Sequence, residues 1–242
     1  MKTMNVRSRS TLLAATLATS ALTACGGGGG SSLVTPATFD LQAGISHLVT
    51  SGQSSNVTLS GSVVVNGTST PISGSGTLTL TAGTMATFNA TAALAQTETI
   101  SGTVTAAGQS APYSVTVVDY YASSSDDFLG EVESGEYDVA STPFTYPATV
   151  MGGSSGSLGT VNRYTDSSMG VALGTVQVGY TVTAGTNPSG PVTVAITSKI
   201  YDTQNNLTET DVTSYSLTSG GVLSLVSATA QNASGSIDAT AQ

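Results

Sequence analysis

The acidic side chains best placed to do chemistry lie close together in the middle of the chain. Six of the fourteen acids fall within thirteen residues: Asp126, Asp127, Glu131, Glu133, Glu136 and Asp138. Calcium takes six to eight oxygen ligands, often from carboxylates in a loop. Asp126, Asp127, Glu131 and Glu133 are therefore candidate Ca²⁺ ligands. Their spacing does not match an EF-hand loop, so a solvated acidic loop is the alternative interpretation.

Other catalytic chemistry has few residues available to it. His47 is the single histidine, so any Ser-His-Asp mechanism has to use it. Zinc enzymes usually take three ligands from His or Cys, and the chain has one residue of each type. Two carboxylates can cleave a glycosidic bond, but tryptophan, a frequent sugar platform, is absent. We therefore expect no enzyme and no cofactor, with His47 half-exposed at a strand edge.

Aromatic residues are spread over the middle of the chain. They are Tyr120, Tyr121, Tyr137, Phe144, Tyr146 and Tyr164. If exposed together they would form a recognition surface, and if buried they would pack two halves of the protein against each other. The sequence leaves both possibilities open.

The amino end has the three parts of a secretory signal. Residues 1–10 carry Lys2, Arg7 and Arg9 without an acid, residues 11–22 are mostly Leu and Ala, and Leu22-Thr23-Ala24-Cys25 follows. A basic start, a short apolar run and small residues before a cut site define such signals. The apolar run is shorter than the roughly 20 residues that span a bilayer core.

Leu22-Thr23-Ala24-Cys25 resembles the lipobox of bacterial lipoproteins. The resemblance covers about the first 25 residues and implies a signal peptide over residues 1–24, cleaved between Ala24 and Cys25. It also implies that Cys25, the sole cysteine, carries a diacylglycerol thioether that anchors the protein to a membrane. Stable anchoring needs more than one acyl chain, which this modification supplies. Gly26 after the cysteine is similar to the pattern of outer-membrane lipoproteins in Gram-negative bacteria.

The rest of the chain is acidic and poor in charge. Removal of Lys2, Arg7 and Arg9 leaves two basic side chains, Arg163 and Lys199, against fourteen acids, a net charge of −12. Nucleic acid is excluded as a partner, because phosphate binding needs clustered Lys and Arg. The partners expected are the membrane, through the lipid on Cys25, and an unidentified protein or carbohydrate.

Alternating apolar and hydroxyl residues predict β-strands in most of the chain. Val57, Leu59 and Val63 share one face of a strand, and Asn66-Gly67 then favours a tight hairpin turn. Residues 90–95 have helical propensity but are expected to be a strand. No segment shows a helical apolar stripe of useful length.

These elements predict an all-β protein with two antiparallel modules. After a flexible Gly/Ser tether at residues 25–34, we expect an immunoglobulin-like sandwich over 35–121 and an acidic boundary segment over 122–138. A meander sheet with a frayed tail is expected over 139–242. One continuous sheet bent over itself is the alternative.

Three functions remain open at this stage. The leading one is a non-enzymatic binding or structural module anchored in the bacterial envelope, at the outer membrane. The second is an envelope carrier or assembly factor that shelters an apolar ligand in a concave sheet. The third is a carboxylate-dependent enzyme that uses Glu131, Glu133 and Glu136.

Overall fold

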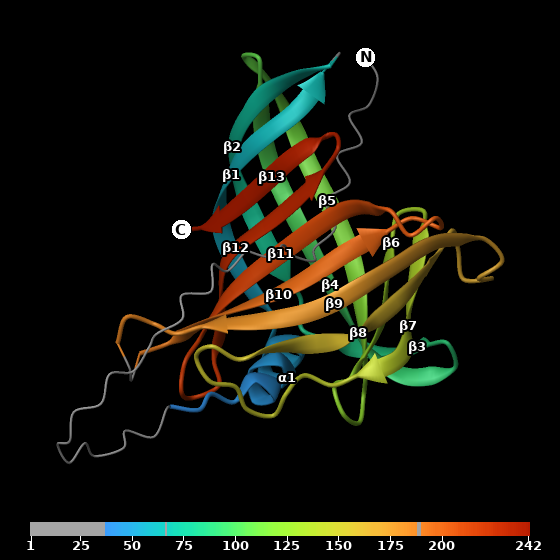
Figure 1. The fold of residues 1–242 in the computed structure, drawn as a ribbon, viewed down its shortest axis with the longest axis vertical. Helices are drawn as coiled ribbons and strands as arrows, with labels where there is room; N and C mark the ends of the chain where they lie inside the picture. Colours follow the sequence, from blue (N-terminus) through green and yellow to red (C-terminus); the bar gives the residue numbers. More distant parts are fainter. Residues whose placement is uncertain (1–36, 66, 188–189) are drawn as a thin grey trace, which may run out of the picture.

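A single antiparallel sheet and one helix make up the part of the protein that the structure, a computed structural model, describes: residues 37–65, 67–187 and 190–242. Figure 1 shows their arrangement. The elements are α1 (Leu41–Ser51), β1 (Gln53–Val65), β2 (Thr68–Leu80), β3 (Thr84–Phe88), β4 (Thr91–Ala106), β5 (Gln109–Ala122), β6 (Phe128–Glu133), β7 (Glu136–Phe144), β8 (Ser155–Tyr164), β9 (Ala172–Thr183), β10 (Val192–Tyr201), β11 (Leu207–Leu217), β12 (Leu223–Asn232) and β13 (Gly235–Ala241).

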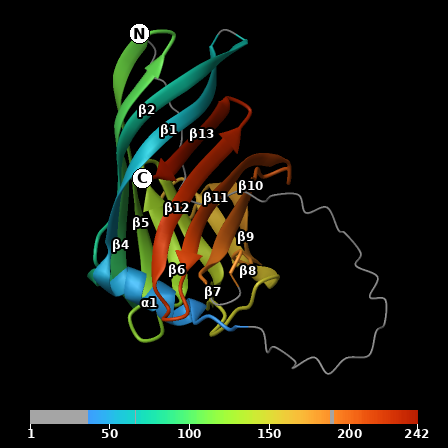
Figure 2. The same ribbon diagram turned by 90° about the vertical axis from the view of Figure 1, so that its left-hand side faces the viewer.

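The strands close into a barrel. Their order is β10-β11-β12-β13-β1-β2-β4-β5-β6-β7-β8-β9, with β3 paired to β4 outside this path. β9 and β10, the two ends of the path, lie side by side (Figures 1 and 2). The contact between these two strands closes the sheet on itself.

Strand periodicity decides which side chains enter the barrel. On β10 every second residue is buried, from Val192 through Val194 and Ile196 to Ile200. The residues between them, mostly Thr and Ala, face outward and are partly exposed. β1 and β2 pair as an antiparallel hairpin with Val65 opposite Thr68, while Asn66 of the predicted turn lies outside the described residues. Residues 91–95 begin β4 as a strand.

The prediction of two separate modules is wrong. All thirteen strands belong to one sheet, and residues 122–138, the expected boundary, contribute β6 and the start of β7 to the same barrel. The sequence predicts short connections between neighbouring antiparallel strands, and the structure has them. The pairing of strands from the two ends of the chain does not follow from the alternation of residues within each strand. The alternative of one continuous sheet agrees with the structure.

The expectation of a frayed tail is also wrong. β13 pairs with β12 on one side and with β1 on the other. Ile237 and Ala239 are buried in the barrel. The tail therefore completes the sheet by joining the carboxyl end of the chain to its first strand.

The helix α1 was not predicted. Leu41, Ile45, Leu48 and Val49 form its buried stripe at the spacing of successive helical turns. Gly44 and the β-branched residues around it weaken the sequence signal. A Cβ at Gly44 would lie 3.0 Å from the Gly221 carbonyl oxygen, so the helix passes close to the loop before β12 at this point. Figure 2 shows α1 across one end of the barrel, which it closes. No helix among the described residues is long and apolar enough to cross a membrane.

A small aromatic cluster lies outside the barrel wall. Phe88 at the end of β3 stacks on Tyr120 and Tyr137, with ring centroids 4.5 and 5.1 Å apart. The Tyr137 hydroxyl donates a hydrogen bond to the Asn89 side chain at 2.8 Å. β3 therefore folds over β5, β6 and β7 and covers their outer face.

Gly174 marks the closure of the barrel between β9 and β10. Its φ is +133°, and a Cβ there would lie 1.9 Å from the Tyr201 carbonyl oxygen. We expect Gly174→Ala to lower the free energy of unfolding by about 2–3 kcal/mol, because the backbone has to strain or the strands have to separate. Urea denaturation measures this loss. Gly220→Ala is the control, since the nearest atom to its Cβ lies 3.9 Å away; equal losses in both variants would contradict the close approach at Gly174.

Candidate functional site

A cavity of about 80 Å³ lies inside the barrel above α1. Each water position needs about 10–15 Å³ of such volume, so the cavity has room for roughly five to eight water-sized groups. Ile45, Leu48 and Val49 of α1 line it at one end. Val161, Val176, Val178 and Ile196 form an aliphatic side, from β8, β9 and β10.

Three carboxylates line the same cavity. They are Glu98 on β4, Asp119 on β5 and Glu131 on β6, called the carboxylate group below. Asp119 and Glu131 are direct partners across two strands, which places their Cβ atoms about 5 Å apart. Glu98 pairs with Val117 and is thus diagonal to Asp119. Burial and the charges of Glu131 and Glu98 raise the pKa of Asp119 well above its ordinary value.

Aromatic rings form a wall beside the carboxylate group. Tyr121 meets Phe128 edge to face at 5.7 Å, Phe128 stacks on Phe144 at 5.0 Å, and Phe144 meets Tyr146 at 6.3 Å. All four residues, called the aromatic wall below, line the cavity, as does Tyr215 from β11. Burial raises the pKa of the Tyr121, Tyr146 and Tyr215 hydroxyls, so they stay protonated at neutral pH.

Ser198 adds a polar atom to the cavity lining. It lies on β10 with its side chain turned inward, and it is 0% exposed. Its Oγ has no hydrogen-bond partner among the described residues. A buried hydroxyl without a partner costs free energy, so this position is suited to a group that enters the cavity.

Gln96 ties the helix to the barrel beside the cavity. Its side-chain nitrogen donates to the Leu48 carbonyl oxygen at 2.8 Å and to the Thr81 carbonyl oxygen at 2.9 Å. The residue is 1% exposed. One amide therefore satisfies a carbonyl near the end of α1 and another in the loop after β2.

We expect Gln96→Ala to lower the free energy of unfolding by about 2–3 kcal/mol. The change removes both hydrogen bonds, the buried one to Leu48 and the partly buried one to Thr81, and leaves space where the buried amide packed. Chemical denaturation measures the loss, and hydrogen exchange should show faster opening of α1 than of β10 and β11. Gln177→Ala is the control, because Gln177 is exposed on β9. If the α1 amides exchange in Gln96→Ala at the same rate as in the native chain, Gln96 does not hold the helix against the barrel.

A buried ion pair lies further along the barrel interior. The Arg163 guanidinium on β8 lies 2.9 Å from Glu136 and 3.8 Å from Asp138, both on β7. All three residues are at most 8% exposed. Arg163 and Lys199 are the only basic Lys or Arg residues in the described ranges, and Arg163 is the one inside.

The four candidate calcium ligands do not form one site. Asp126 accepts a hydrogen bond from Ser46 of α1 at 2.5 Å, and Asp127 accepts from Ser125 at 2.7 Å and from Thr145. Glu131 lines the cavity, and Glu133 lies opposite Glu136. Within residues 37–65, 67–187 and 190–242, no group of three or more His, Cys, Asp or Glu side chains is placed to hold a metal ion.

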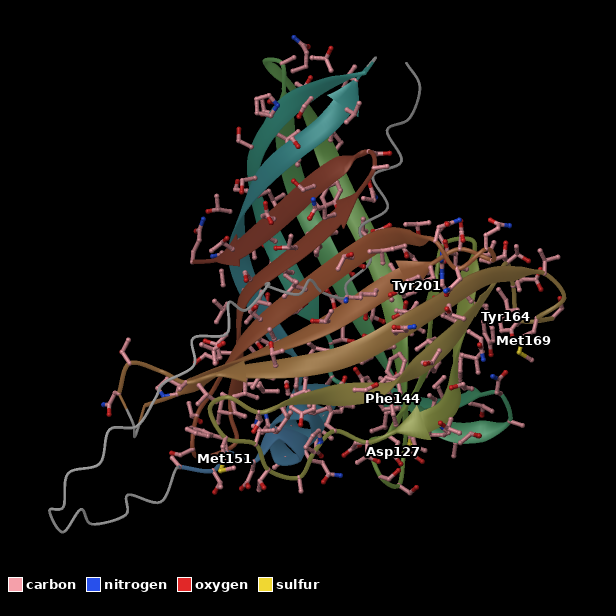
Figure 3. All side chains as sticks on the ribbon, viewed as in Figure 1. Asp127, Phe144, Met151, Tyr164, Met169 and Tyr201 are labelled. Carbon is pink, nitrogen blue, oxygen red and sulfur yellow. The ribbon has the colours of Figure 1, made fainter. Side chains whose placement is uncertain are left out.

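The other predicted positions are scattered. His47 is exposed on α1 and not at a strand edge. Ala24 and Cys25 lie outside the described residues. The aromatic residues of the middle region divide between the inside and the outside of the barrel. Phe144 and Asp127 lie near the end of the molecule that α1 closes (Figure 3).

The sequence analysis missed Glu98, Asp119, Gln96 and Tyr215. A usable signal exists in β4, where Leu94, Gln96, Glu98 and Ile100 share one face of the strand. Charged or amide residues on the buried face of a strand indicate a polar interior. On β5, Asp119 likewise shares a strand face with Val117 and Tyr121, which indicates a polar side chain in the interior.

Comparisons with known proteins give one distant structural likeness. No family model and no curated protein matches the chain. A solved structure from Bacteroides fragilis, described as a candidate exported protein with a YmcC-like fold, is similar with a TM-score of 0.33 and 10% identity. The alignment covers 80% of this chain and 96% of that one.

Proposed function

We propose that this protein is a lipid-anchored, non-enzymatic protein of the bacterial envelope that binds a small ligand inside its barrel. The observation that carries the proposal is the cavity, which has aliphatic, aromatic and carboxylate surfaces on different sides. Ligand sites are typically apolar concavities with a few convergent polar groups.

The cavity does not favour the carrier of a purely apolar ligand. Glu98, Asp119 and Glu131 all line it, and an apolar ligand would remove water from them without replacing its hydrogen bonds. A ligand with both an apolar and a polar part can form hydrogen bonds with the carboxylate group and pack its apolar atoms against the aliphatic and aromatic residues.

The anchor rests on the amino-terminal sequence. The basic start, the apolar run and Leu22-Thr23-Ala24-Cys25 support cleavage before Cys25 and lipidation of its thiol. Mass spectrometry of the exported form tests this: we expect a chain that begins at Cys25 and carries acyl groups, in the outer-membrane fraction. An unmodified Cys25 in a periplasmic fraction would refute the anchor.

Native mass spectrometry tests the binding function. Protein purified without denaturants should carry a small non-covalent adduct that is lost on unfolding. Ile196→Trp fills the cavity from β10 and should remove the adduct, whereas Thr197→Trp, which points outward from the same strand, should keep it. Circular dichroism verifies that both variants fold. An adduct that persists in folded Ile196→Trp, or none in the native chain, would refute ligand binding in the cavity.

A further inference from the structure

Acidic side chains line one side of the cavity. The carboxylate group comes from the neighbouring strands β4, β5 and β6, so its three side chains act on the same part of the cavity. The ionisable residues among the described lining are these three acids and three tyrosines, with no Lys, Arg or His. A cation that enters is attracted and an anion is repelled, and the effect is stronger than in water because the interior is less polarisable.

The aromatic wall adds a second attraction for the same kind of ligand. The face of an aromatic ring binds a cation within about 6 Å of its centroid, and desolvated sites bind it best. Tyr121 is on β5, the strand of Asp119, and Phe128 is on β6, the strand of Glu131. The rings and the carboxylates therefore face one space from adjacent positions.

The chemistry of the remaining walls distinguishes an organic cation from a metal ion. No group of acids among the described residues is placed to hold a metal, and the other side of the cavity is formed by Val161, Val176, Val178 and Ile196. Methyl or methylene groups bound to a charged nitrogen would contact these residues. The volume suits a group of about five to eight heavy atoms, and the fully buried Ser198 hydroxyl offers a hydrogen bond to a polar substituent.

We propose that the barrel cavity binds a small organic ammonium group, with its charge against Glu98, Asp119 and Glu131 and its carbon atoms against the aromatic and aliphatic walls. This inference rests on the proposed function, since it names the class of ligand for the same cavity. A free amine and the headgroup of a choline lipid share this chemistry.

Isothermal titration with three probes tests the inference and separates it from the proposed function. Choline chloride supplies the ammonium, 3,3-dimethylbutan-1-ol has the same shape without the charge, and dihexanoylphosphatidylcholine carries the group on a lipid. We expect choline to bind at least about tenfold more tightly than the neutral alcohol. Tighter binding of the lipid than of choline, with choline still bound more tightly than the neutral alcohol, would support the ammonium class and identify a lipid as its source.

Two outcomes overturn the inference in different ways. Equal binding of choline and the neutral alcohol would keep the cavity as a ligand site but refute the ammonium class. Binding of none of the three probes, together with a native mass spectrum without an adduct, would refute the proposed function as well.

Substitutions in the carboxylate group test whether these side chains cause the preference for choline over the neutral alcohol. Glu131→Gln should weaken choline binding about tenfold and leave the neutral alcohol unchanged, and Glu98→Gln is the second variant if the first fails to fold. Asp238→Asn removes the same charge from the outer face of β13, between the buried Ile237 and Ala239, and should bind like the native chain. Native-like choline affinity in both folded carboxylate variants would overturn the inference.

Discussion

Arg163→Met is expected to lower the free energy of unfolding by about 3–5 kcal/mol. The guanidinium lies 2.9 Å from Glu136 and 3.8 Å from Asp138, inside the barrel. Methionine fills much of the same volume but leaves two buried carboxylates without their cation. Urea denaturation at neutral pH measures the change.

Two further variants make this result specific. Lys199→Met removes the other basic side chain, which points outward from β10, and should change the free energy of unfolding by less than about 0.5 kcal/mol. Combining Arg163→Met with Glu136→Gln should recover part of the lost free energy of unfolding, because the Glu136 side chain then no longer carries a buried charge without its cation. A loss in Arg163→Met no larger than in Lys199→Met would contradict a buried ion pair.

Asp119→Asn should stabilise the protein at pH values above the ordinary pKa of an aspartate. Burial and the charges of Glu131 and Glu98 raise the pKa of Asp119 in the folded state. Between the ordinary and the raised pKa the folded state holds a proton that the unfolded state has lost, so the free energy of unfolding falls as pH rises. Asparagine removes this loss, which is about 1.4 kcal/mol for each pH unit of the shift.

The stability difference between Asp119→Asn and the native chain should depend on pH. Below the ordinary pKa of an aspartate, both states of the native chain are protonated, so the advantage of Asp119→Asn should vanish there. Denaturation curves at a series of pH values, with Asp238→Asn as the control for loss of one charge, measure it. An Asp119→Asn protein that is less stable than the native chain at pH 8 would show that the ionised carboxylate is stabilised inside the barrel.

Strands with a two-residue period were predictable from the sequence. On β10 the alternation of Val192, Val194 and Ile196 with threonine and alanine is enough to define a strand and its buried face. Barrel closure was not predictable in this way. It depends on β13 pairing with β1, positions more than 170 residues apart such as Val57 and Ala241, and short repetitive strands do not specify their distant partners by pattern.

The acidic character of the site was predictable from the sequence, but the residues that form it were not. The sequence directed attention to the acidic run from Asp126 to Asp138, and Glu131 from that run does line the cavity. Glu98 and Asp119 join it only because β4, β5 and β6 are neighbours in the sheet. Asp126 and Asp127 instead bond to hydroxyls around α1 and the loop after β7, since they precede the strand that carries Glu131.

A crystal structure of the protein grown in choline chloride at neutral pH tests the central claim most directly. We predict electron density for one choline molecule in the cavity, with its nitrogen beside Glu98 and Glu131 and its methyl groups against the aromatic wall. A cavity that holds ordered water alone at saturating choline, or one collapsed around its carboxylates, would contradict it.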